Sequence, residues 1–167
     1  VSLVGEAIEL RRGGITAPLL VLGAVPATQA GRALEAGLEV TVFTREAALA
    51  FSGAAAARRK RARVHLKIDT GMNRIGCQPK EAADLCSYIV RLPAIELAGV
   101  YSHLATADDP DPTFAREQLD IFLSTVAEIE ERGILIPLRH IANSSGTLWL
   151  PESRLDMVRC GIALYGL

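Results

Sequence analysis

The stretch from Val64 to Gly76 carries the strongest chemical signal in this chain. Its first half alternates apolar and polar residues, which predicts a strand with His65, Lys67 and Asp69 on one face. A glycine-containing loop with Arg74 follows. Burial lowers the pKa of a lysine, and a neutral amine can react with carbon dioxide to give a carbamate that pairs with an arginine. This stretch predicts either an anion-handling site or a structural ion pair at a strand end.

A second candidate site lies near the end of the chain. Asn143-Ser144-Ser145-Gly146 follows a predicted strand and could hold a phosphate through a hydroxyl and free backbone N–H groups. Arg159 adds a permanent cation, and Gly161, followed by Ile162, lets backbone approach a ligand closely. The alternative interpretation of Asn143–Gly146 is a helix N-cap and a turn.

Histidines give a weaker signal. His103 ends a predicted strand over 97–103, where a lone histidine is more often structural than catalytic. His65 and His140 fall in the middle of two other predicted strands, so we expect no metal site. The acidic run over 108–111 is predicted to be a solvated loop.

The elements that must position these residues alternate between helix and strand. Alternation with continuous apolar strands predicts a parallel sheet flanked by helices. A doubly wound sheet and a TIM barrel both satisfy the pattern, but polar residues at the ends of several strands favour the barrel. We expect a partial TIM (β/α)8 barrel with about six parallel strands and the first two strands missing. The predicted helices cover 2–12, 28–36, 45–59, 79–92, 113–132 and, at most as a short helix, 144–150; the predicted strands cover 19–23, 39–44, 62–69, 97–103, 137–143 and 155–164.

Composition limits the possible partners. The 167 residues are 50% hydrophobic and 22% charged, with a net charge of −1, which gives no electrostatic reason to expect a nucleic-acid or membrane partner. The three cysteines have no metal-ligand spacing and predict free thiols in the cytoplasm. Because the chain starts at Val1 with a helical pattern under way, we expect it to be a piece of a longer protein.

Four segments, in order, resemble the alanine racemases, which use pyridoxal 5′-phosphate (PLP). They are His65–Gly76, Tyr101–Asp108, His140–Ser145 and Asp156–Leu167, and the opening Gly5–Arg11 with Pro18–Gly23 also fits. The resemblance implies that residues 1–167 belong to the family's PLP-binding barrel domain, truncated at both ends and without the C-terminal β domain. It further implies an isomerase that interconverts L- and D-alanine, supplies D-alanine for peptidoglycan and works as a homodimer.

The resemblance also assigns residues. Lys67 is similar to the family's carbamylated lysine, and the carbamate would hold Arg74 near the cofactor and the substrate carboxylate. His103 would lie against the pyridine ring, and Arg159 would face the pyridine nitrogen. The phosphate would be held by Ser144 with the backbone of Gly161 and Ile162, in a pocket that Asn143 also lines.

Two family groups fall outside this chain by the same resemblance. The Schiff-base lysine lies on the first barrel strand, before Val1, and the catalytic tyrosine lies in the C-terminal domain of the partner subunit. We therefore expect the 167-residue chain to be inactive by itself. Two other interpretations stay open: a related PLP barrel enzyme, such as a broad-specificity amino-acid racemase or a decarboxylase, and a non-catalytic PLP-homeostasis protein.

Overall fold

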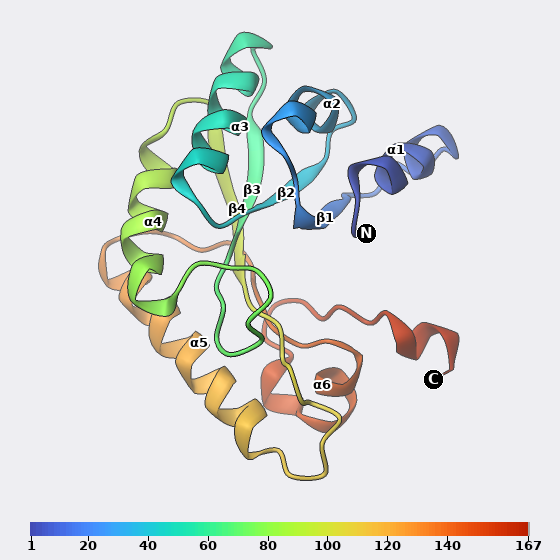
Figure 1. Ribbon diagram of the computed structural model, residues 1–167, viewed down its shortest axis with the longest axis vertical. Helices are drawn as coiled ribbons and strands as arrows, with labels where there is room; N and C mark the ends of the chain where they lie inside the picture. The colour runs from blue at the N-terminus through green and yellow to red at the C-terminus, as the bar shows by residue number, and fades with distance from the viewer. Residues whose placement is uncertain (167) are drawn as a thin grey trace.

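The structure, a computed structural model that describes residues 1–166, contains five parallel strands and the helices that connect them (Figure 1). The strands are β1 (Leu20–Ala24), β2 (Glu39–Val42), β3 (Ala62–Lys67), β4 (Ile95–Tyr101) and β5 (Arg139–His140). The α-helices are α1 (Val4–Arg12), α2 (Ala30–Glu35), α3 (Arg45–Ala57), α4 (Pro79–Arg91), α5 (Thr113–Glu131) and α6 (Ser144–Trp149). Three short 3₁₀ helices complete the described elements: η1 (Ala27–Gln29), η2 (Pro151–Ser153) and η3 (Ile162–Tyr165).

The strand order decides between the two architectures that the sequence left open. The sheet runs β1-β2-β3-β4-β5, so each new strand is added on the same side of the previous one. A doubly wound sheet reverses this order at a switch point, whereas a barrel does not. Right-handed crossovers that always advance in one direction place their helices on one face, and Figure 1 shows α3, α4 and α5 along one side of the central strands. This is the barrel-type arrangement.

The two faces of the sheet differ in chemistry. Strand residues on the helix-covered face are apolar and almost fully buried, and they pack with Phe51, Ile89 and Phe122 from the helices. The other face carries the buried polar residues Thr41, His65, Lys67, Tyr101 and His140. Because successive strand residues point to opposite faces, the polar alternation at 65–69 is an inner, buried face and not a solvated one.

The predicted strand over 155–164 is wrong. Two backbone bonds do follow β5, from the Asp156 N–H to the Arg139 oxygen and from the Arg159 N–H to the Ala142 oxygen, each 3.1 Å long. The chain then turns at Gly161, with φ −108° and ψ −82°, into η3. These two bonds are too few and too widely spaced to form a ladder, so the segment follows the sheet without joining it.

One helix also differs from expectation. The predicted helix over 28–36 is divided: Thr28 lies inside η1, and α2 begins only at Ala30 without a side-chain cap.

None of the helices within residues 1–166 combines the length and the apolar character needed to cross a membrane.

Candidate functional site

The carboxyl ends of β1, β3 and β4 line a cavity of about 400 Å³. Lys67 reaches it from the end of β3, Tyr101 from the end of β4 and Arg159 from the segment after β5. Parallel strands all end at one edge of a sheet, so side chains far apart in sequence meet there. The cavity is lined by Ser2, Leu22, Gly23, Ala24, Lys67, Arg74, Ile75, Tyr101, His103 and Arg159. Lys67, Arg74 and Arg159 bring positive charge to this lining, which makes the cavity suitable for an anion.

Lys67 is the most deeply buried of these cations, with 2% of its surface exposed. Its Nζ donates a 2.8 Å hydrogen bond to the Ile68 carbonyl, and burial lowers its pKa to about 8, with the charges of Arg159 and Arg74 also lowering it. Asp69 opposes this shift but forms no hydrogen bond with Lys67; its Oδ1 accepts the N–H groups of Gly71 and Asn73. The structural ion pair considered for this stretch is therefore not formed.

The loop after β3 presents Arg74 at the cavity. The loop closes on itself where the Asp69 N–H donates to the Cys77 oxygen and the Cys77 N–H donates to the Lys67 oxygen, at 2.9 and 3.0 Å. Gly76 makes this closure possible: its φ is +131°, and a Cβ there would lie 2.7 Å from the Asp69 nitrogen. Within residues 1–166 Arg74 forms no salt bridge, so its guanidinium stays available to a ligand.

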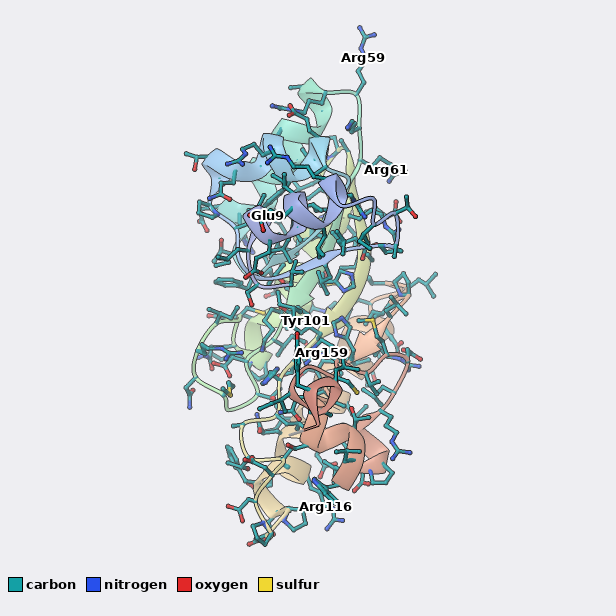
Figure 2. The ribbon with its side chains drawn as sticks, turned by 90° about the vertical axis from the view of Figure 1, so that its right-hand side faces the viewer. Glu9, Arg59, Arg61, Tyr101, Arg116 and Arg159 are labelled. Atoms are coloured by element: carbon teal, nitrogen blue, oxygen red, sulfur yellow. The ribbon has the colours of Figure 1, made fainter. Side chains whose placement is uncertain are left out.

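Arg159 lies at the centre of the site. Its guanidinium donates to the Ser102 and Ile141 carbonyls, at 2.7 and 3.0 Å, and to Nδ1 of His140 at 2.6 Å. It also lies 5.2 Å from the centroid of the Tyr101 ring, and Figure 2 shows the two side chains next to each other in the middle of the molecule. Burial lowers the pKa of Arg159 to about 10, so it remains charged at neutral pH.

His103 lies beside this cation. Its Nδ1 is 3.4 Å from an Arg159 nitrogen. Burial, followed by the charges of Arg159, Arg74 and Lys67, lowers the pKa of His103 to about 4. The imidazole is therefore neutral at physiological pH and offers a flat, uncharged ring at the cavity wall.

A second hollow of about 310 Å³ adjoins the first and shares Leu22, His103 and Arg159 with it. Its remaining lining residues are Asn143, Ser144, Ser145, Gly161 and Ile162. The Ser144 hydroxyl accepts the N–H groups of Gly161 and Ala163, at 3.0 and 3.2 Å, which ties the start of η3 to the start of α6. Asn143 caps α6 by accepting the Gly146 N–H, so the N-cap interpretation of this residue holds together with its position in the hollow.

The structure brings together all the site residues that the sequence singled out, but sequence reasoning missed Tyr101. Its hydroxyl is 2.7 Å from that of Thr41, and its ring lies below both Lys67, at 5.4 Å, and Arg159. Its place in the predicted strand over 97–103, on the same face as His103, was an available signal. Within residues 1–166 no group of three or more His, Cys, Asp or Glu side chains could hold a metal ion.

Comparisons with known proteins agree on one family. The family model described as "Alanine racemase, N-terminal domain" matches residues 1–167. The chain is 44% identical to the alanine racemase of Desulfovibrio desulfuricans over 167 residues, covering 100% of this chain and 45% of that protein. It is 46% identical to the alanine racemase of Symbiobacterium thermophilum, covering 100% of this chain and 44% of the relative. The chain thus spans less than half the length of these curated relatives.

Solved structures give the same answer. Alanine racemase from Clostridium difficile 630 in complex with cycloserine matches with a TM-score of 0.97 and 36% identity, over 99% of this chain and 46% of that one. Alanine racemase from Bacillus anthracis with bound L-Ala-P matches with a TM-score of 0.92 and 36% identity, over 100% of this chain and 43% of that one. The five-strand sheet corresponds to part of the barrel domain of these enzymes, which confirms the expected α/β barrel class. The chain belongs to the alanine racemase N-terminal domain family.

Proposed function

We propose that residues 1–167 form most of the PLP-binding barrel domain of an alanine racemase. The observation that carries this proposal is the pair of adjoining hollows that share Arg159: Lys67 and Arg74 line the first, and Ser144 lines the second. PLP carries an anionic phosphate at one end and a pyridine ring in the middle, and its substrate carries a carboxylate. The cationic cavity and the hollow beside it suit these groups in size and in charge.

The residues divide into two groups around such a cofactor. Ser144, Gly161 and Ile162, with Asn143 beside them, would hold the phosphate, since they line one hollow and the Ser144 oxygen accepts the N–H groups of Gly161 and Ala163, which leaves its own O–H to donate. His103 would lie against the ring because it is neutral and flat. PLP supplies an electron sink that makes the α-proton of a bound amino acid easier to remove.

Arg159 would limit how strong this electron sink becomes. An arginine keeps its proton at neutral pH, and two carbonyls and His140 fix the orientation of this one. Facing the pyridine nitrogen, it would donate a hydrogen bond without giving up a proton. The nitrogen would stay unprotonated, which disfavours side reactions such as transamination.

Arg74, held in place by Lys67, would bind and orient the substrate carboxylate. With its pKa lowered from 10.5 to about 8, Lys67 has a larger neutral fraction for reaction with carbon dioxide than an ordinary lysine has. The resulting carbamate would replace a buried positive charge with a negative one and attract Arg74 into the cavity. Arg74 has no salt bridge to break within residues 1–166, so it could make this contact at little cost.

Proton transfer would come from groups outside these residues. Racemisation needs an acid/base on each face of the α-carbon. The chain has three lysines: Lys60 donates to the Leu34 carbonyl, Lys80 is exposed on α4, and Lys67 has the role above. We therefore propose that a lysine and a tyrosine from other segments complete the site, the tyrosine from the partner in a cytoplasmic homodimer that provides D-alanine for peptidoglycan.

A hybrid enzyme tests this proposal. In it, these 167 residues replace the matching segment of the Desulfovibrio desulfuricans relative. We expect the hybrid to interconvert L- and D-alanine and the 167-residue chain alone to show no turnover. Arg74→Ala should raise KM for alanine, whereas Arg116→Ala, a control on an exposed arginine of α5 far from Arg159 in Figure 2, should not.

Other outcomes would favour the other interpretations. A hybrid that binds PLP and acts on other amino acids but not alanine would indicate a broad-specificity racemase or a decarboxylase. A hybrid that binds PLP without turnover would favour the PLP-homeostasis protein. Racemase activity in the isolated chain would contradict the proposed origin of the proton-transfer groups.

A further inference from the structure

A continuous row of buried side chains connects Arg159 to a carboxylate outside the cavity. Arg159 is 2.6 Å from Nδ1 of His140, whose Nε2 is 3.0 Å from Nδ1 of His65. Nε2 of His65 is in turn 2.8 Å from Oε2 of Glu39. His140, His65 and Glu39 are 0%, 1% and 8% exposed, and none of them lines either cavity of the site.

Donor and acceptor requirements fix the protons in this row. Arginine can only donate, so Nδ1 of His140 must accept and its Nε2 must carry the hydrogen. That hydrogen points at Nδ1 of His65, so the hydrogen of His65 must lie on Nε2, from which it is donated to Glu39. Burial lowers the pKa of His140 to about 2, and the hydrogen bond from His65 lowers the pKa of Glu39. Both imidazoles are thus neutral between one cation and one anion.

Gly99 makes this row possible. His65 is on β3 and His140 on β5, so β4 lies between them. Gly99 is the register partner of His65 on β4, and a Cβ there would lie 2.7 Å from Nδ1 of His65. The imidazole therefore passes over a position that only glycine leaves open. The opening at Gly99, the burial of His65 and His140 and the unbroken series of hydrogen bonds together fix the geometry of this row.

We propose that Glu39 and His65 are positioning residues that act on Arg159 through His140. The ionised carboxylate fixes the tautomer of His65, and His65 fixes that of His140. His140 then presents a lone pair to Arg159 in every molecule. All three hydrogen bonds run in the same direction, so they polarise one another and favour the charged guanidinium.

The consequence for catalysis rests on the proposed function. If Glu39 lacked its acceptor oxygen, the buried Nε2–H of His65 would have no partner, and the opposite pair of tautomers would become competitive. In those tautomers Nδ1 of His140 carries a hydrogen that faces an Arg159 donor, and the two groups repel. The guanidinium would then lose its fixed orientation at the pyridine nitrogen.

Nitrogen-15 NMR of the full 167-residue chain tests the proposal directly, because its three histidines can be assigned individually. At pH 7 we expect both His65 and His140 to give the neutral Nε2–H pattern. Glu39→Gln keeps an oxygen acceptor and should preserve both patterns. Glu39→Leu should convert them to the Nδ1–H form or to a mixture and should shift the Arg159 side-chain signals.

A matched control is Glu96→Leu, since Glu96 shares Arg63 with Glu39 but contacts neither histidine. It should leave all histidine signals unchanged. The proposal is overturned if wild-type His65 or His140 is cationic or protonated at Nδ1, a result that needs no variant to fold. It is also overturned if a folded Glu39→Leu protein keeps the wild-type pattern.

The hybrid enzyme separates this inference from the proposed function. We expect Glu39→Leu to lower kcat with KM for alanine unchanged, and Glu39→Gln to restore kcat. An inactive wild-type hybrid with the expected NMR pattern would refute the racemase proposal. It would leave standing the inference that Glu39 fixes the tautomers of His65 and His140. An active hybrid whose kcat is unaffected by Glu39→Leu would refute the role of the row in positioning Arg159.

Discussion

Replacing Lys67 by methionine should stabilise the folded chain at neutral pH and change how its stability depends on pH. Burial lowers the pKa of Lys67 from 10.5 to about 8, which corresponds to about 3 kcal/mol because one pKa unit is worth about 1.4 kcal/mol. The unfolded chain binds this proton more tightly than the folded chain does. The free energy of unfolding of the wild type should therefore rise with pH between about 8 and 10.5, by roughly 2 to 3 kcal/mol relative to Lys67→Met.

Urea unfolding of both proteins in carbonate-free buffer from pH 7 to pH 10 measures this difference. Comparison with the variant is essential, because burial also raises the pKa values of Cys77 and Cys86 to about 12, and these thiols lower stability at alkaline pH in both proteins. Lys80→Met, at an exposed lysine of α4, serves as the control and should follow the wild-type profile. Parallel profiles for wild type and Lys67→Met would refute the reasoning, since Lys67 would then carry no buried charge.

Three further outcomes follow from the structure. Gln118→Leu should lower the free energy of unfolding, measured in urea, by about 2 kcal/mol, because the Ala105 N–H loses the acceptor that lies 2.8 Å away in a partly buried loop. An unchanged urea midpoint would contradict this. The ring signals of His103 should titrate near pH 4, and a midpoint near 6.5 would show that the ring is not shielded. Because the unfolded histidine takes up its proton at a higher pH than the folded one, the free energy of unfolding should fall as the pH drops from 6.5 to about 4. Phe122 is 0% exposed, and Phe122→Ala should lower the free energy of unfolding by about 3 to 5 kcal/mol. Phe114→Ala, at 42% exposure, should lower it much less, and equal decreases would place Phe122 outside the core.

Much of the fold was predictable from local patterns. Helix types were correct where a segment had its own boundary signal, such as Pro79 at the start of α4 or Gly133, with φ +76°, after α5. The strand predicted over 155–164 was wrong because its apolar residues look the same whether the backbone finds a full ladder or only two bonds. Pairing depends on the neighbouring segment, which a local pattern does not contain.

The sequence by itself determined that Lys67, His103 and Asn143 lie at or just beyond the carboxyl ends of parallel strands, and therefore at one edge of the sheet. Arg159 reaches the same edge from a segment that the sequence wrongly predicted to be a strand. Only the tertiary structure decided how these residues are coupled. His65 and His140 are 75 positions apart, and they meet because Gly99 leaves space over the intervening strand. Such a contact depends on strand order and register, which arise from packing of the whole sheet.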